Sequence, residues 1–191
     1  DEQHPYLRER GLTPETIHAF GLGYCRHGLM QGRIVIPIHN VLNGLVAYAG
    51  RWPGEPPENE PKYRLPGGFR KSLELFNLHR AQRADETLPL LVVEGYFDCL
   101  KVWQAGYHRV VALMGSRLSE MQAARIIETV GFGGRVRLWF DGDASGRNGS
   151  EAAKRMLGEW TKVDIIELPG RQPDELPQAD LQGLLNRREP S

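Results

Sequence analysis

From residue 88 onward, short apolar runs alternate with segments whose apolar residues recur at helical spacing. The runs are rich in β-branched and aromatic residues, which is typical of buried strands. We expect strands at residues 88–94, 109–113, 135–140 and 163–168, with helices at residues 97–105, 119–129 and 149–160. Ser119 and Gln122 have the spacing of a capping box at the start of the second of these helices. This alternation predicts an α/β fold with a mostly parallel sheet flanked by helices.

The pattern before residue 88 differs and predicts a smaller α+β part. Thr13-Pro14-Glu15 combines a capping hydroxyl, a proline at the first helical position and an acid in the first turn, and Gly21 follows as a helix end. Apolar segments at residues 33–38 and 45–50 flank Asn43-Gly44, a dipeptide that favours type I′ turns. We therefore expect a hairpin, in which Pro37 indicates an edge strand or a bulge.

Two further segments complete this first part. Residues 53–61 are rich in Pro, Gly, Glu and Asn, so we expect an exposed, mobile loop. Residues 73–81 have the apolar spacing of a short helix. We place the domain boundary after this helix, with a basic subdomain at residues 1–86 and the alternating α/β domain at residues 87–191.

Acidic residues directly follow two of the predicted strands. Glu94 ends one apolar run, and Asp141 and Asp143 follow another in the sequence Asp-Gly-Asp. Ligands of open parallel sheets bind beyond the carboxyl ends of the strands, where these acids would converge if the strands are neighbours. Converging carboxylates repel one another unless a cation lies among them, and hard oxygen ligands suit Mg²⁺. The sequence therefore predicts a metal site for phosphate chemistry.

Basic residues gather in a different part of the chain. Residues 26–83 contain nine Lys or Arg against four Glu, an excess of five positive charges, although the whole chain has a formal net charge of zero. A basic wall beside an acidic edge suits a metal-dependent enzyme that acts on nucleic acid. A solvated surface would have the same composition.

The composition indicates an ordinary soluble chain. No apolar run approaches the length of a membrane span, and no signal-peptide pattern opens the chain, so we expect a cytoplasmic protein without a membrane partner. Cys25 and Cys99 have no CxxC companion, which excludes a zinc ribbon within these residues and favours a core position for Cys99. The chain starts with Asp1 and ends in the polar residues 187–191, so we expect a fragment of a longer protein.

Several motifs together resemble a known family. Val93-Glu94-Gly95-Tyr96-Phe97-Asp98 and Phe140-Asp141-Gly142-Asp143-Ala144-Ser145-Gly146-Arg147 resemble the TOPRIM domain in its DnaG-type bacterial primase form. Upstream, the order and spacing of five short segments are similar to the basic amino-terminal subdomain of that primase's RNA polymerase core: residues 32–38, 50–51, 61–63, 69–71 and 75–78. The resemblance covers roughly residues 5–177, and it extends to the primase-like proteins that mobile elements carry.

The resemblance implies a site and a reaction. It implies that Glu94, Asp141 and Asp143 are catalytic and bind metal, Mg²⁺ or Mn²⁺, with Asp98 in support. It also implies that nucleotide or nucleic acid is bound by Arg33, Arg51, Lys62, Tyr63 and Lys71. The implied function is that of a DNA primase core, which makes short RNA primers from ribonucleoside triphosphates on a single-stranded DNA template. A replicative helicase would bind through domains outside these residues.

The chain departs from the family pattern at two places. The family has an Asp-Pro-Asp motif after its last strand, whereas this chain has Gln172-Pro173-Asp174. Asp174 is then the acid that this loop offers to a metal, and the number of metals is in question. After Lys62-Tyr63 the family commonly has an asparagine, but Arg64 follows here.

Simpler interpretations stay open for each motif. Asp-Gly-Asp after a strand also suits a turn with a helix cap, and Glu94 and Asp98 also suit the first turn of a helix. Arg147 is either a phosphate contact or a solvated helix start. Trp103, Trp139 and Trp160 have core-facing spacing and are interpreted as packing residues. A TOPRIM nuclease or a non-catalytic nucleic-acid-binding module would carry the same acids.

Overall fold

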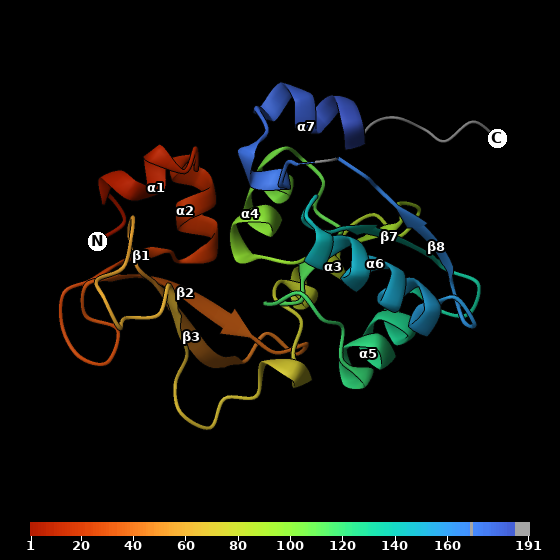
Figure 1. Cartoon of the computed structure of the whole chain (residues 1–191), viewed down its shortest axis with the longest axis horizontal. Coiled ribbons are helices and arrows are strands. Elements are labelled where there is room, and N and C mark those ends of the chain that lie inside the picture. Colours follow the sequence, from red (N-terminus) through yellow and green to blue (C-terminus); the bar gives the residue numbers. More distant parts are fainter. Residues whose placement is uncertain (169, 186–191) are drawn as a thin grey trace. The chain divides into compact units, whose positions relative to one another are not determined.

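The computed structural model describes residues 1–168 and 170–185, which form two compact units, Asp1–Arg70 and Lys71–Ser191 (Figure 1). Residues 186–191, the end of the predicted second domain, lie outside the described residues. Residues 71–86 belong to the second unit by their contacts, although the sequence placed them in the first domain. The reason is a β-bridge in which Phe76 and Ala112 exchange two backbone hydrogen bonds of 3.0 and 3.1 Å.

The first unit combines two short helices with an antiparallel sheet. The helices are α1 (Pro5–Glu9) and α2 (Pro14–Phe20), and the strands in sheet order are β1 (Gly23–Cys25), β2 (Arg33–His39), β3 (Leu45–Arg51) and β4 (Tyr63–Arg64). The Thr13 hydroxyl caps α2 by accepting the Thr16 N–H at 3.3 Å, and Gly21 ends it in the left-handed conformation at φ 63°. The predicted boundaries of α2 are confirmed, whereas the pattern did not predict α1.

The β2–β3 hairpin is confirmed, but its predicted type I′ turn is wrong. Asn43 has a positive φ of 66°, whereas Gly44 does not. The Asn40 carboxamide oxygen accepts the backbone N–H groups of Leu42 and Gly44, which stabilises a longer loop. Pro37 lies at an edge position next to a bulge, as expected. Strand β1 pairs with β2 only up to Val35, and the register of β2 against β3 shifts just after Ile38.

The second unit is built on a parallel sheet of order β6-β5-β7-β8. Its strands are β5 (Leu90–Val93), β6 (Val110–Ala112), β7 (Arg135–Trp139) and β8 (Lys162–Ile165), and its helices are η1 (Lys71–Leu73), α3 (Leu78–Ala81), α4 (Tyr96–Gln104), α5 (Glu120–Val130), α6 (Ala144–Leu157), η2 (Pro173–Glu175) and α7 (Gln178–Leu185). Helices α5 and α6 lie side by side on one face of the sheet, with α4 on the other (Figure 1). Every residue of β5 is buried, so the sheet is the core of this unit.

Most predicted elements of this unit are confirmed, including the Ser119–Gln122 capping box and the burial of Cys99. Two helices differ. The predicted helix at residues 73–81 is limited to α3 and the short η1, because Asn77 interrupts it with a φ of 69°. Helix α6 starts at Ala144, before the predicted residue 149, and ends before Trp160.

The three tryptophans have different environments. Trp139 in β7 is fully buried, as predicted. Trp103 stacks on His108 with ring centroids 4.7 Å apart. Trp160 lies past the end of α6 and is 50% exposed, so its predicted packing role is wrong. The reason is that the chain has already left the helix and turns toward β8. Among residues 1–168 and 170–185, no helix has both the length and the apolar character needed to cross a membrane.

Candidate metal and nucleotide site

The carboxyl ends of β5 and β7 bring two predicted acids together. These strands are neighbours in the sheet, with Val93 paired to Trp139. Glu94 follows β5 directly, and its Oε1 accepts the backbone N–H of Asp141 at 3.0 Å. The predicted convergence of the two strand ends is therefore a feature of the fold.

Two glycines allow the backbone around the Asp-Gly-Asp turn to pack closely against neighbouring carbonyl groups. A Cβ on Gly146 would lie 2.0 Å from the carbonyl oxygen of Asp141, and one on Gly142 would lie 2.3 Å from that of Leu168. The Asp143 Oδ1 accepts the Gly146 N–H at 2.8 Å, so this side chain caps α6. The simpler interpretation of Asp143 as a helix cap is thus correct for one of its oxygens, and the cap holds its carboxyl group beside the strand end.

The acids influence one another electrostatically. The pKa of Glu94 is raised to about 7, mainly by burial, with the negative charges of Asp141 and Asp143 adding to the rise and the hydrogen bond from the Asp141 N–H opposing it. Burial disfavours the charged form of the carboxyl group, and the neighbouring acids add a smaller repulsion. A cation at this position would relieve that repulsion.

Asp98 joins two loops of the site. It lies in the first turn of α4, and its carboxylate accepts the Gly95 N–H at 3.0 Å and the Asp174 N–H at 3.1 Å. Burial raises the pKa of Asp98 well above its usual range, and the charges of Asp174 and Asp141 add to the effect. The side chain is only 6% exposed, so it supports the site by holding the loops that carry Glu94 and Asp174.

The loop after β8 reaches the same site. It contains η2, and just before η2 the Gln172 side-chain amide donates to the Asp141 Oδ2 at 2.9 Å. The sequence marked residue 172 as a position where an acid is lost, but it did not predict that the amide would contact Asp141. The altered motif drew attention to Gln172, but only the fold shows that Asp141 is its hydrogen-bond partner.

The donor set fits a hard divalent cation. Glu94, Asp141 and Asp143 offer carboxylate oxygens from two adjacent strand ends, which suits Mg²⁺ or Mn²⁺. In the described part of the chain, no three acidic, His or Cys side chains are grouped closely enough to form a metal site as they stand. Glu94 and Asp141 each accept a hydrogen bond on a carboxylate oxygen that a cation would use.

Two of the predicted basic contacts are instead internal to the first unit. Arg33 has a fully buried side chain, which donates to Glu60 at 2.7 Å and to the Pro61 carbonyl at 2.8 Å. Arg51 is 5% exposed and donates to the hydroxyl groups of Tyr6 and Tyr63. Both side chains are therefore buried and engaged inside the first unit, which does not favour direct contact with nucleic acid, and the binding role of Arg33 and Arg51 stays a prediction.

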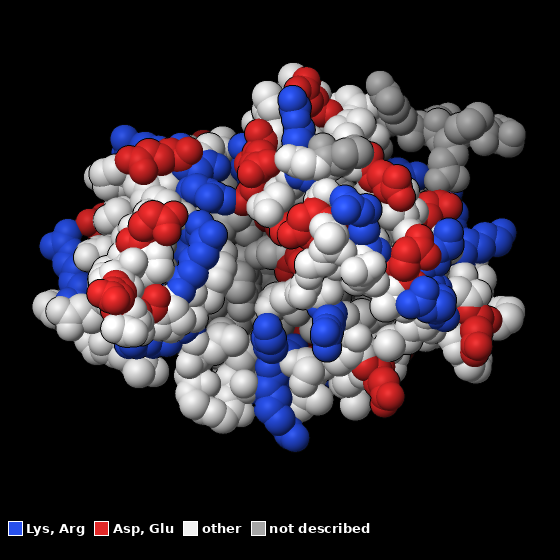
Figure 2. All heavy atoms as spheres, viewed as in Figure 1, with Lys and Arg blue, Asp and Glu red and all other residues white. Residues whose placement is uncertain are grey.

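The other predicted contacts are more accessible. Lys62 is exposed and Tyr63 is half-buried, with its hydroxyl bonded to Arg51. Lys71, in the second unit, is exposed and its Nζ donates to the Met114 carbonyl at 3.0 Å. Figure 2 shows Lys and Arg interspersed with Asp and Glu over the visible face, so basic residues form no uninterrupted wall on that face.

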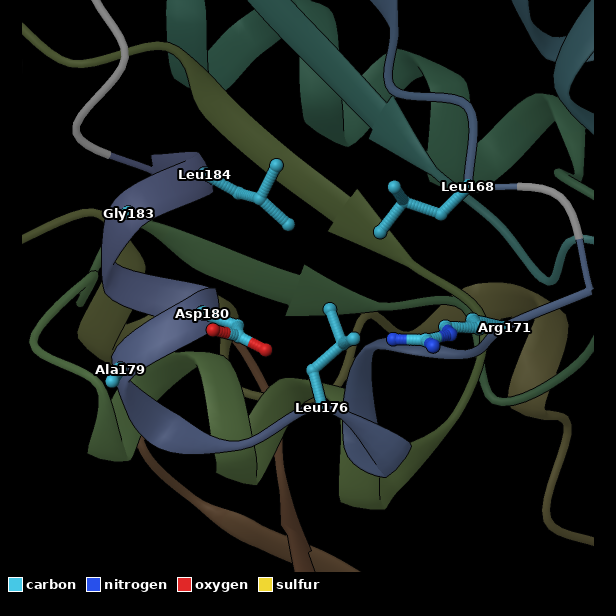
Figure 3. Close-up of a pocket in the computed structure, with 7 residues that line it drawn as sticks. All are labelled: Leu168, Arg171, Leu176, Ala179, Asp180, Gly183 and Leu184. Atoms are coloured by element: carbon cyan, nitrogen blue, oxygen red, sulfur yellow. The ribbon is translucent and has the colours of Figure 1, made fainter.

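A hollow of about 460 Å³ lies beside the loop that carries Gln172. Leu168, Leu176 and Leu184 point into the same space, and Arg171 and Asp180 extend toward it from either side (Figure 3). The hollow is lined by the flanks of η2 and by α7, together with Ala179 and Gly183. It contains none of the predicted site residues.

The sequence and the fold are similar to those of known proteins. The family described as the Toprim domain matches residues 89–167. A DNA primase of Staphylococcus aureus strain COL is 29% identical over 184 residues, which cover 90% of this chain and 30% of that protein. The primase of Aquifex aeolicus, solved with its zinc-binding and RNA polymerase domains, has a TM-score of 0.82 and 26% identity, covering 97% of this chain and 55% of that chain.

A third protein supports the fold alone. A DnaG primase catalytic domain bound to single-stranded DNA has a TM-score of 0.79 at 24% identity, over 96% of this chain and 69% of that chain. The chain spans about 30% of the length of the curated relatives that it matches. Residues 89–167 are therefore a TOPRIM domain, and most of the chain is homologous to the catalytic core of DnaG-type DNA primases.

Proposed function

We propose that this chain is the catalytic core of a DNA primase, which joins ribonucleotides on a single-stranded DNA template. The observation that carries the proposal is the contact of Glu94 with Asp141 at two adjacent strand ends of a TOPRIM domain. The similarity to DNA primases also continues beyond the TOPRIM region and covers 90% of the chain. That extent favours a primase over other enzymes that share the TOPRIM domain.

In the proposed reaction, the 3′-hydroxyl of one nucleotide attacks the α-phosphorus of a ribonucleoside triphosphate. A phosphorus–oxygen bond forms, the bond to pyrophosphate breaks, and the hydroxyl proton passes to solvent. Glu94, Asp141 and Asp143 would hold a divalent cation, Mg²⁺ or Mn²⁺, which neutralises phosphate charge when bound. Asp98 keeps the loops of Glu94 and Asp174 together, so the acids stay in position while substrates come and go.

The proposed nucleic-acid contacts are the accessible basic residues. Lys62 lies on the surface of the first unit, and Lys71 is fixed at its Nζ by a backbone carbonyl in the second unit. Tyr63 offers a partly exposed ring beside Lys62. A DnaG catalytic domain of the same fold binds single-stranded DNA, which supports a template of that kind for this chain.

A primer-extension assay tests the proposal. The whole chain is incubated with single-stranded DNA that carries a short annealed RNA, labelled ribonucleoside triphosphates and either Mg²⁺ or Mn²⁺. We expect template-dependent extension of the RNA, because extension needs the catalytic acids but not the initiation that flanking domains assist. Glu94→Ala should abolish it, whereas Glu128→Ala, which removes an exposed acid of α5, should leave it unchanged.

Two results would favour the alternatives. Metal-dependent cleavage of the labelled DNA or RNA without incorporation would identify a TOPRIM nuclease. Binding of single-stranded DNA with neither incorporation nor cleavage, and without any dependence on Mg²⁺ or Mn²⁺, would identify a non-catalytic module. No feature of the described residues favours either of these over the primase.

A further inference from the structure

Gln172 contacts the acid site through its neutral side chain. Its Nε2 donates to the Asp141 Oδ2 at 2.9 Å, while its backbone N–H donates to the Glu175 carboxylate at 3.1 Å. Asp141 in turn donates its own backbone N–H to Glu94. Hydrogen bonds therefore join Gln172 to Asp141 and Asp141 to Glu94, and the donor on Gln172 is a neutral amide.

The turn at residues 172–175 has a second anchor on the site. The backbone N–H of Asp174 donates to the buried carboxylate of Asp98 at 3.1 Å. The preceding segment also packs closely, because the Gly170 N–H donates to the Gly142 carbonyl at 3.3 Å. Both contacts hold the turn against the acidic loops through an N–H donor, and neither requires a cation.

An acid at residue 172 would reverse one of these contacts. Its carboxylate oxygen would take the place of the amide nitrogen and face the Asp141 carboxylate at hydrogen-bonding distance. Like charges at that distance repel strongly when the site is partly buried, and a cation between them would be needed to hold the turn. The chain avoids this requirement by having glutamine.

We propose that Gln172 is a positioning residue that takes the place of a second cation. Its amide holds Asp141 and keeps the turn at residues 172–175 anchored when no metal is bound, so the site takes one divalent cation, held by Glu94, Asp141 and Asp143. The inference rests on the proposed function in one respect, namely that these acids bind a cation. The anchoring of the turn is independent of any reaction.

The test replaces Gln172 with glutamate, a side chain of nearly the same shape that carries a negative charge. In EDTA, Gln172→Glu should lower the melting temperature of the whole chain by roughly 4 °C, because the amide–carboxylate attraction becomes a repulsion. Millimolar Mg²⁺ or Mn²⁺ should restore at least half of that loss, since a cation can now bind between residues 141 and 172. The wild-type melting temperature should rise less on the same addition.

A matched control separates this effect from the mere loss of an amide donor. Gln182 in α7 donates its Nε2 to the Ala105 carbonyl at 3.2 Å, so Gln182→Glu removes a comparable bond and adds the same charge to the same unit. We expect Gln182→Glu to lose some stability in EDTA, but the metal should not restore it.

A charge swap tests the contact itself. In Asp141→Asn/Gln172→Glu, the carboxylate and the amide exchange places, so the double variant should regain in EDTA at least half of the stability lost by Gln172→Glu. Calorimetric titration should also give one strong Mn²⁺ site for the wild type and additional binding for Gln172→Glu.

Two outcomes would overturn the inference. One is a Gln172→Glu variant that is as stable as the wild type in EDTA. The other is a loss that neither Asp141→Asn nor the metal restores, which would make Gln172 a turn residue without a role toward Asp141. None of these measurements uses activity, so a failed primer-extension assay would overturn the proposed function and leave this inference standing.

Discussion

The two units use their charged residues in opposite ways. In the first unit, Arg33 and Arg51 are buried and hold the unit together through Glu60, two tyrosines and backbone carbonyls. In the second unit, Glu94 and Asp141 lie at strand ends, partly exposed, and burial together with like charges raises the pKa of Glu94 to about 7. The two arginines have partners inside the protein, whereas a cation beside Glu94 and Asp141 is what we propose.

This difference shows which sequence signals locate a functional site. An acid at the end of a buried parallel strand is placed by topology, because neighbouring strand ends meet at one edge. A basic residue in a strand is placed by what covers its face of the sheet, since Arg33 and its neighbour Ile34 point to opposite faces of β2 and are both fully buried. A count of charges in a segment does not distinguish an inward arginine from an exposed lysine.

The largest expected effect separates the two roles of Asp143. Asp143→Ala removes both the cap of α6 and a proposed metal ligand, so primer extension should fall at least about 100-fold and stability by about 1 kcal/mol. Asp143→Ser retains a capping oxygen and should recover the stability but not the activity. Urea unfolding and the extension assay measure the two effects. If the serine variant is active, Asp143 is a cap and not a ligand.

The next effect concerns Arg33, the fully buried cation. Arg33→Ala should lower the free energy of unfolding by about 2–4 kcal/mol, because it leaves a cavity and the Pro61 carbonyl without its donor. Arg26→Ala, at a side chain that is 68% exposed, should cost less than about 0.5 kcal/mol. Urea unfolding compares the two. An Arg33→Ala protein of unchanged stability that has lost single-stranded DNA binding would instead support the prediction that Arg33 binds nucleic acid.

A smaller effect is expected at the glycines of the acidic turn. Gly146→Ala would place a Cβ 2.0 Å from the Asp141 carbonyl oxygen, so the turn must open. We expect a loss of about 1–3 kcal/mol together with weaker metal binding. Gly183→Ala, in α7, meets no atom within 4 Å and should be neutral or slightly stabilising. Equal effects of both substitutions would show that the turn is not tightly packed.

The smallest effect is the pH dependence that Glu94 contributes. Its pKa is about 7 in the folded chain against an ordinary value of 4.5, so the folded state binds the proton more tightly. Its stabilising contribution is complete below pH 4.5 and is lost as the pH rises through 7. Because Glu94 is only partly buried, we expect a decrease of about 1 kcal/mol between pH 5 and pH 8 in EDTA.

Glu94→Gln should remove this decrease, so the variant should be more stable than the wild type at pH 8. Glu128→Gln, at an exposed position of α5, should retain the wild-type dependence. Melting temperatures across the pH range measure both variants. An unchanged slope in Glu94→Gln would assign the pH dependence to other groups.

Much of the second unit was predictable because its signals are local. The apolar pattern predicted the strands, and the spacing of Ser119 and Gln122 predicted the capping box. The positions of Glu94 and Asp141 followed from their place directly after two strands. The start of α6 was missed because its glycine-rich first turn lacks an apolar stripe and depends on the Asp143 cap. The longer β2–β3 loop was missed because it depends on the side chain of Asn40.

The contacts of Gln172 and Asp98 were beyond the sequence for another reason. Both join segments that are far apart in the chain, with Gln172 bonded to Asp141 and Asp98 bonded to Asp174. The burial of Arg33 likewise depends on Glu60, which lies in a segment that the sequence predicted to be an exposed loop. Long-range partners of polar side chains require the fold to be known.

The most direct test of the account locates the cation. Mn²⁺ is titrated into ¹⁵N-labelled chain, and the paramagnetic broadening of backbone amide signals is mapped. We predict the strongest broadening at Gly95 and Gly142, beside the acids, and weak broadening at Gly133, which precedes β7 at the opposite edge of the sheet. Glu94→Gln should weaken the broadening at both positions. Broadening centred elsewhere, or unaffected by Glu94→Gln, would contradict the claim that these strand-end acids form the metal site.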